Sequence, residues 1–200
     1  MERCVRYFPE FGEQNTPAVV DCVRRRLDDG DVSTLLVATS TGKTALLFAE
    51  ALGKRKGLRM LAVGNPPGSA YEPISAENRQ KLAALGVQIV DYAPYGCAAL
   101  QGDAHKNMYG ALDLLVVVAD VWRMMGGQGL KVAMEIGLMA TNVGALQAGE
   151  RVIAVGGTAS GADTAIVMKA AYSLDVFSSE PERRPDLLEF ICTPLPKKWW

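Results

Sequence analysis

The sequence predicts an α/β protein, a three-layer α/β/α sandwich with a mostly parallel sheet. Apolar runs of strand length, at residues 32–39 and 58–63, alternate along the chain with longer segments of helical spacing. Apolar runs without alternating polar residues are typical of strands buried on both faces, and their alternation with helices is typical of a parallel sheet covered on both sides. Hydrophobic residues make up 49% of the 200 residues, which is enough for one core. We therefore expect a single domain that spans residues 1–200.

Local signals place the individual elements. Asn15, Thr16 and Pro17 supply a capping residue and a first-turn proline at the start of a helix that continues to Leu27. We expect strands at residues 3–8, 32–39, 58–63, 87–90, 151–155, 164–168 and 188–192, and further helices at 44–52, 76–85, 109–125 and 130–143. A run of glycines at 126–129 separates the last two helices. The irregular loops at 64–75 and 92–108 have no assigned role.

The charge balance argues against a nucleic-acid partner. The chain carries 21 Lys and Arg against 22 Asp and Glu, a formal net charge of −1, whereas nucleic-acid-binding domains present a basic patch. Two short basic runs, at 24–26 and 54–56, each lie near the end of a predicted helix, where positive charge complements the helix dipole. We expect both runs on solvated faces.

Cysteine usage and hydropathy favour a cytoplasmic protein. Cys4, Cys22, Cys97 and Cys192 have no short pairing and the chain has 1 His, so we expect no metal site. Four dispersed thiols are expected to be buried and reduced. No secretory signal is visible, and the longest apolar stretch, at 111–122, is interrupted by two aspartates and is too short to cross a bilayer. We expect no membrane association.

Two turns rich in glycine and hydroxyl groups are the candidate binding features. The first follows the strand at 32–39 and contains Ser40, Thr41, Gly42 and Thr44; the second, at 156–163, follows the strand at 151–155. Ligands of open α/β sheets bind outside the carboxyl ends of the strands. Hydroxyls, a glycine that permits close approach and the free N–H groups of the following helix form an anion site. The sequence therefore predicts a phosphate site on these turns.

Familiar nucleotide motifs are absent from both turns. Gly42, Lys43 and Thr44 resemble the end of a Walker A motif, but that motif needs a glycine where Val37 stands. The second turn has Thr158 where a dinucleotide fingerprint needs its middle glycine. Either turn alone is also explained as a tight connection without a ligand. Asp163 has two interpretations: an acceptor for a sugar hydroxyl, or a cap on neighbouring backbone N–H groups.

Several segments resemble the carboxy-terminal domain of pyruvate kinase. VATSTGKTA at 37–45 is similar to the TxSGxTA turn of that domain, and GERVIAVGG at 149–157 is similar to its GD-x-VVV-x-G strand. The resemblance extends nearly end to end to stand-alone archaeal and bacterial proteins called pyruvate kinase alpha/beta domain-like. YFPEFGEQNT at 7–16, GLKVAMEIGLMATNVG at 129–144 and, above all, VIAVGGTASGADTAIVM at 152–168 carry it.

The resemblance implies a ligand and a set of contact residues. Members of this family have been seen with FMN, so FMN becomes the expected ligand. The resemblance implies that the phosphate binds to Ser40, Thr41, Gly42 and Thr44, and that Asn15 and Thr16 lie beside it. It also implies that the neighbouring edge is formed by Gly157, Thr158, Gly161 and Asp163. The chain departs from its relatives at 64–67, where they carry a histidine-containing loop, and at 92–108. Both departures fall where the ring system would lie.

The expected function is a stand-alone binding module for FMN or another phosphorylated metabolite. The resemblance does not extend to the barrel domain, in which pyruvate kinase chemistry takes place. The sequence also shows no cluster of carboxylates that could hold the metal ions for phosphoryl transfer. We therefore expect no pyruvate kinase activity. The alternatives are an FMN-dependent oxidoreductase, for which no catalytic residue is assigned, and a sugar-phosphate sensor. We also expect a homo-oligomer, with the terminal Trp199 and Trp200 docked on a neighbouring subunit.

Overall fold

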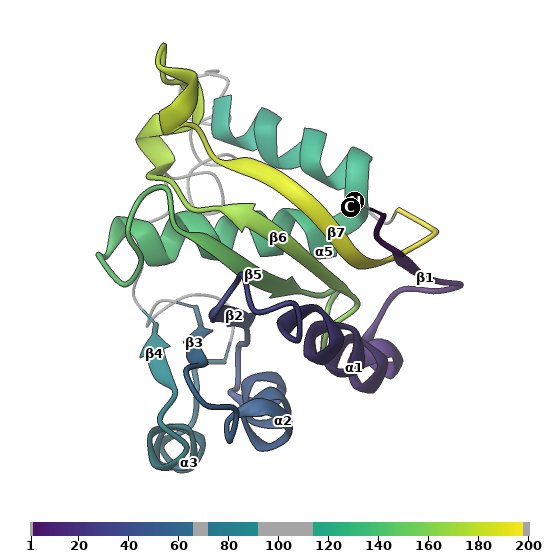
Figure 1. Ribbon diagram of the computed structural model, residues 1–200, viewed down its shortest axis with the longest axis vertical. Helices are drawn as coiled ribbons and strands as arrows, with labels where there is room; N and C mark the ends of the chain where they lie inside the picture. Colours follow the sequence, from purple (N-terminus) through teal and green to yellow (C-terminus); the bar gives the residue numbers. More distant parts are fainter. Residues whose placement is uncertain (1, 66–71, 92–113, 198–200) are drawn as a thin grey trace.

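The strands assemble into one mostly parallel sheet. The structure, a computed structural model, describes residues 2–65, 72–91 and 114–197. Its strands are β1 (Arg6–Phe8), β2 (Thr34–Ala38), β3 (Arg59–Val63), β4 (Gln88–Val90), β5 (Arg151–Gly156), β6 (Thr164–Lys169) and β7 (Asp186–Pro194). They form a seven-stranded sheet in the order β1-β7-β6-β5-β2-β3-β4 (Figure 1). Every neighbouring pair is parallel except the two that contain β6, so the predicted mixed α/β fold is confirmed.

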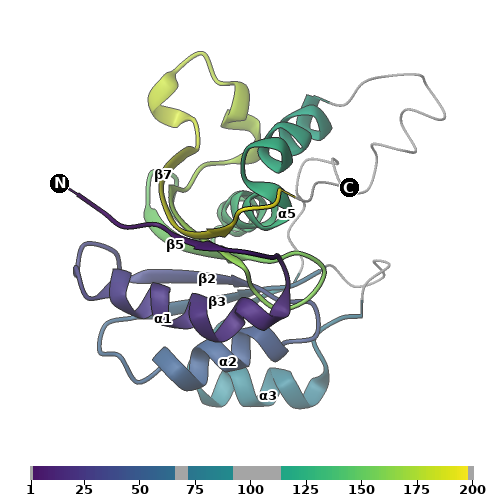
Figure 2. The ribbon, with the colours of Figure 1, turned by 90° about the vertical axis from the view of Figure 1, so that its right-hand side faces the viewer.

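Helices cover both faces of this sheet. The helices α1 (Thr16–Leu27), α2 (Lys43–Leu52) and α3 (Ala76–Ala84) lie on one face, and α5 (Leu114–Asn142) lies on the other (Figure 2). Short 3-10 helices occupy Glu13–Asn15, Ser173–Phe177 and Pro181–Arg183. The arrangement is the three-layer sandwich that the sequence predicts. Among the described helices, none combines the length and hydropathy that a bilayer crossing needs.

The apolar run of β2 explains how two cores are built on one sheet. Leu35 and Val37 point into the core beneath α1 and α2, whereas Leu36 points into the core beneath α5. All three side chains are fully buried. Because successive side chains of a strand alternate between faces, a strand covered on both sides needs apolar residues at every position.

A backbone break in α5 occurs at the predicted glycine run. Gly127 has φ 79° and ψ −178°, which interrupts the helical backbone where the sequence predicts two separate helices. Close packing explains two other glycines: a Cβ at Gly129 would lie 2.2 Å from the Thr164 hydroxyl oxygen, and a Cβ at Gly156 of β5 would lie 2.2 Å from the Gly129 carbonyl oxygen. Glycine on both elements lets the backbone of α5 rest directly on β5.

The direction of β6 has a simple physical cause. Its connection to β5 is the turn at 157–163, and a parallel crossover needs a dozen residues or more. The short turn therefore forces an antiparallel hairpin, in which Gly156 pairs with Thr164.

One expectation about charge was wrong, because Arg26 is buried and does not lie on a solvated face. Its side chain is 5% exposed, and its guanidinium pairs with Asp31 at 2.6 Å and with Glu189 of β7 at 2.8 Å. An arginine of a helix end is buried here because two carboxylates from other elements neutralise it. The loop at 92–108, the helix start at 109–113, Cys97, Trp199 and Trp200 lie outside the described residues.

Candidate functional site

The two predicted turns leave neighbouring strands at the same edge of the sheet. In the parallel pair of β2 and β5, Val37 lies opposite Val155. Neighbouring strands are about 4.8 Å apart, so the turns that follow Ala38 and Gly156 start side by side. The start of α1 reaches the same edge, because the Gly12 N–H donates a hydrogen bond to Asp163 at 3.0 Å. The carboxyl edge of the sheet thus gathers both turns and one helix start.

The first turn presents the start of α2. Gly42 is the residue before the helix and has φ +93°, a left-handed conformation that favours glycine. Its N–H donates to the Thr39 hydroxyl at 3.1 Å. No side chain caps α2, so the N–H groups of its first turn, from Lys43 onward, have no acceptor within the helix. Uncapped first-turn N–H groups and the helix dipole favour an anion at this position.

Two asparagines that sequence reasoning missed hold the first turn. Asn65 Nδ2 donates to the Ser40 hydroxyl at 3.0 Å, and Asn78 Nδ2 donates to the Thr41 carbonyl at 2.8 Å. The Ser40 oxygen accepts in this bond, so its own proton stays available for donation to a ligand. Thr44 is half-buried, and its hydroxyl forms no hydrogen bond with a described residue. No local motif marks Asn65 or Asn78, because both contacts span long stretches of sequence.

The second turn is packed against the start of α1. The Thr16 hydroxyl accepts a hydrogen bond from the Ala162 N–H at 2.9 Å and lies 3.4 Å from the Ala162 carbonyl oxygen. Gly161 has φ +67°, and a Cβ there would lie 2.6 Å from the Cα of Glu13. Both the left-handed backbone and the close approach require glycine.

Asp163 connects the elements of this edge. Its side chain is fully buried, and one carboxylate oxygen accepts from the Gly12 N–H at 3.0 Å and from the Thr158 N–H at 3.1 Å. The other oxygen accepts from the Thr164 hydroxyl at 2.9 Å. Of the two interpretations of Asp163, these contacts match the backbone cap. Gly157 belongs to the same tight turn, where a Cβ added at this position would lie 2.3 Å from the Gly161 carbonyl oxygen.

Asn15 occupies the predicted position but does not cap α1. It precedes the first helical residue, and no side-chain cap bond forms there. Its Nδ2 instead donates to the carbonyls of Glu10 at 2.9 Å and Gly12 at 3.2 Å. The capping role expected from the sequence was therefore wrong, because the preceding loop offers acceptors to the amide first. The helix start itself is confirmed.

A cation also approaches this edge. The Lys197 ammonium donates to the Thr193 hydroxyl at 3.2 Å. Partial burial lowers the pKa of Lys197, and the nearby Asp163 carboxylate opposes that shift. Lys197 lies beyond β7 in the sequence, so only the sheet order brings it near the turns.

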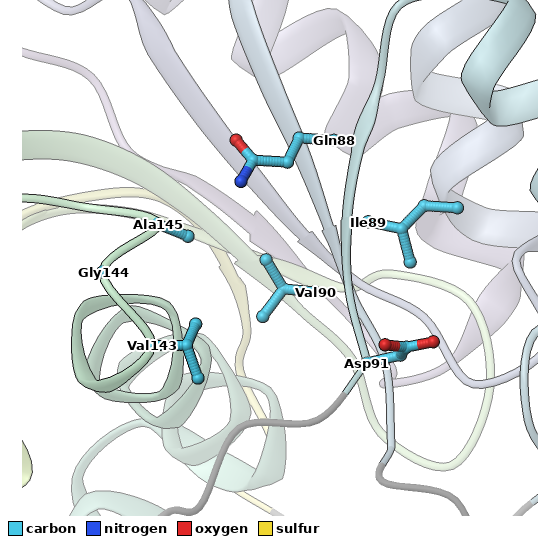
Figure 3. A pocket seen from close by; sticks show the side chains of 7 residues that line it. All are labelled: Gln88, Ile89, Val90, Asp91, Val143, Gly144 and Ala145. Atoms are coloured by element: carbon cyan, nitrogen blue, oxygen red, sulfur yellow. The ribbon is translucent and has the colours of Figure 1, made fainter.

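The predicted site residues thus fall into two groups. Asn15, Thr16, Thr158, Gly161 and Asp163 are joined through the contacts around α1, whereas the turn at 40–44 is held by α3 and residue 65. Two cavities lined by described residues lie elsewhere. One of ≈ 210 Å³ lies between β4 and residues 143–145 (Figure 3), and one of ≈ 590 Å³ lies beside residues 2–6.

Comparison with known proteins gives distant structural similarity. No protein-family model matches the chain. A solved structure of Cryptosporidium parvum pyruvate kinase in complex with ADP is 16% identical over 75% of this chain, with a TM-score of 0.36. An NH3-dependent NAD synthetase from Campylobacter jejuni, in complex with the nitrate ion, is 13% identical over 70% of this chain, with a TM-score of 0.32. The matched parts cover 22% and 54% of those chains. At this similarity neither structure informs the function of the present chain.

Proposed function

We propose that the chain is a stand-alone small-molecule-binding domain that holds the phosphate of FMN at the carboxyl edge of its sheet, without pyruvate kinase activity. One observation carries the proposal: two glycine and hydroxyl turns leave neighbouring strands at this edge, beside an uncapped helix start. The sequence motifs at 37–45 and 152–168 support placing the chain with the stand-alone pyruvate kinase alpha/beta domain-like proteins.

In this proposal the first turn holds the phosphate. The first-turn N–H groups of α2 and the hydroxyls of Ser40, Thr41 and Thr44 donate to its oxygens, and Gly42 allows the close approach. Thr44 is suited to this role because its hydroxyl makes no hydrogen bond with the part of the chain that is described.

In this proposal the second turn forms one rigid side of the phosphate site. Asp163 and Thr16 bind the turn to α1, and Gly157, Thr158 and Gly161 shape its backbone. A rigid turn lowers the entropy cost of ligand binding because it is ordered before the ligand binds. Asn15 holds the loop before α1 through its hydrogen bond to the Glu10 carbonyl and does not contact the phosphate.

Titration with FMN and with riboflavin tests the role of the phosphate. Purified protein is freed of bound flavin and titrated with each compound, with flavin fluorescence as the readout. We expect FMN to bind at least ten-fold more tightly than riboflavin, because riboflavin lacks the phosphoryl group. Equal affinities would refute a phosphate site. Binding of a sugar bisphosphate with no FMN binding would point to the sensor instead.

The variant Thr44→Val tests the first turn directly. It removes one hydroxyl at nearly constant volume, and a hydrogen bond to a charged oxygen contributes about 1.5–3 kcal/mol. FMN affinity should fall by about ten-fold or more, since 1.4 kcal/mol is a factor of ten, and riboflavin affinity should not change. Thr34→Val is the matched control, because it removes a hydroxyl bonded to Glu150 at 2.7 Å at the opposite end of β2. If both variants weaken FMN binding equally, the loss reflects stability and Thr44 does not contact the phosphate.

A further inference from the structure

A cavity of ≈ 590 Å³ lies at the far end of α1 from the two turns. The segment before β1, the last turns of α1 and the middle of β7 line it. Binding sites for small organic molecules span roughly 300–1,000 Å³, so this cavity is large enough for one. Cys4 lines the cavity and is exposed. The expectation that every thiol is buried was therefore wrong for Cys4, because the segment before β1 runs along the edge of the sheet and outside the core.

Four charged side chains of the cavity neutralise one another. Arg26, which is buried, pairs with Glu189 of β7 at 2.8 Å and with Asp29 at 3.2 Å. Arg3 pairs with Glu189 at 3.3 Å and also with Asp29. Each arginine thus contacts both carboxylates, and together they join the segment before β1 to the end of α1 and to β7. Such a network makes the base of the cavity rigid and leaves it without net charge.

Two further arginines of the cavity have no such partners. Arg6 and Arg25 are exposed and form no ion pair with any residue in the described ranges. The guanidinium of Arg6 lies 5.4 Å from the centre of the Phe8 ring, a cation–π contact that orders the side chain without neutralising it. Phe8 packs beneath α1, and alternate residues of a strand share a face, so Arg6 points toward the helix that carries Arg25.

The open side of the cavity therefore carries a small positive charge beside apolar surface. Glu2, the remaining charged residue of the lining, is exposed and has no ion pair within the described part of the chain. Two unpaired guanidinium groups thus face one unpaired carboxylate, which leaves a single net positive charge. Val5 and Ile191 supply apolar surface in the same cavity. Apolar walls with a few convergent charged groups are typical of a site for a small organic ligand.

We propose that this cavity is a binding site for a small organic monocarboxylate. The carboxylate binds between Arg6 and Arg25, because a planar guanidinium group matches its geometry and donates two parallel hydrogen bonds to it. The apolar body of the ligand packs against Val5 and Ile191. A monoanion balances the single net charge, whereas a dianion meets the repulsion of Glu2.

The carboxylate site is separate from the phosphate site. The cavity lies near the C-terminal end of α1, whereas the phosphate turns lie near its N-terminal end (Figure 2). The two sites share no residue, so this proposal stands independently of the proposed function.

Isothermal titration calorimetry of the full chain tests the recognition of charge with two probes of the same shape. 2-Naphthoate carries a carboxylate, and 2-naphthamide is its uncharged counterpart. We expect 2-naphthoate to bind about ten-fold or more tightly than 2-naphthamide, because charge-assisted hydrogen bonds are roughly twice as strong as neutral ones. Equal affinities, or no binding of 2-naphthoate, would overturn the proposal.

Substitution of the two arginines locates the carboxylate. Arg6→Gln combined with Arg25→Gln should remove the preference for 2-naphthoate and leave the affinity for 2-naphthamide unchanged. Arg24→Gln is the matched control, because Arg24 is exposed on the same helix, pairs with Asp21 and does not line the cavity. Arg25→Gln alone keeps the contact between Arg6 and Phe8, so it serves if the double variant fails to fold, and it should lose part of the preference. A preference that is unchanged in Arg25→Gln, or that falls equally in Arg24→Gln, would contradict the proposed site.

Protection of Cys4 shows whether the probe lies in this cavity. Cys4 is exposed, whereas the other cysteines in the described ranges, Cys22 and Cys192, are buried. Saturating 2-naphthoate should slow the alkylation of Cys4 by neutral iodoacetamide several-fold, as measured by mass spectrometry of the peptide that contains it. The protection should persist in Thr44→Val, which changes only the phosphate turn. Unchanged alkylation of Cys4, or loss of the protection in Thr44→Val, would place the bound carboxylate elsewhere and refute the assignment.

Discussion

Replacement of Asp163 is the sharpest test of how the carboxyl edge is held together. In Asp163→Ala, the N–H groups of Gly12 and Thr158 lose their shared acceptor, and no other described group replaces it. A buried donor left unsatisfied costs about 1–3 kcal/mol. The Gly12 N–H is only partly buried, so the loss of both acceptor contacts together should lower the free energy of unfolding by about 3 kcal/mol.

Asp163→Asn separates the hydrogen bonds from the charge. Its amide oxygen accepts from both backbone N–H groups, and the Thr164 hydroxyl reverses to accept from the amide nitrogen. The variant therefore loses only the charge-assisted part of these hydrogen bonds, which lowers its free energy of unfolding by about 1 kcal/mol.

Thermal unfolding at fixed pH measures both changes. For a chain of this size, 1 kcal/mol shifts Tm by about 2–4 °C, so the alanine variant should lose about 6–12 °C and the asparagine variant about 2–4 °C. Asp21→Ala is the matched control, because Asp21 is exposed and pairs only with Arg24 of its own helix. A loss in Asp163→Ala no larger than the control would refute the bridging role of Asp163.

Two further predictions concern the acid stability and the assembly of the chain. The hydrogen bonds from Arg26 lower the pKa of Asp31 from 3.8 to about 2, so this pair stabilises the fold fully above about pH 4 and loses that contribution as the pH falls through 2. In Asp31→Asn, Tm measured from pH 6 to pH 2 should therefore fall less steeply than in the parent protein; an identical slope would contradict the assignment. Val117, Val121 and Met124 form an exposed apolar stripe on α5, 39%, 45% and 63% exposed. Asp120 and Arg123 of the same helix pair with each other at 2.6 Å, so neither leaves an unpaired charge next to a second copy that packs on the stripe. Sedimentation should show a dimer or larger assembly that Val121→Glu dissociates, and a monomeric parent protein would contradict this.

The positions of most elements could be predicted from the sequence. Strands and helices were expected within a few residues of their observed ends, as at β2 and α3, because apolar periodicity and turn residues act locally. The direction of β6 was not predicted, although the short turn at 157–163 contains the information.

The candidate site was predictable only in part. Glycine and hydroxyl residues after two apolar strands mark the turns in the sequence, and the fold places both turns at one edge. The contacts that hold them, from Asn78 to Thr41 and from Asp163 to Gly12, join residues far apart in the chain. No local pattern identifies such partners.

The sequence by itself determined the fold class and the position of each turn, because strand and helix preferences depend on neighbours a few residues away. Only the tertiary structure decided that Arg26 is buried against two carboxylates, those of Asp31 and Glu189. Burial and pairing depend on which elements pack together. The packing of α1 against β7, segments at opposite ends of the chain, brings Arg26 to Glu189.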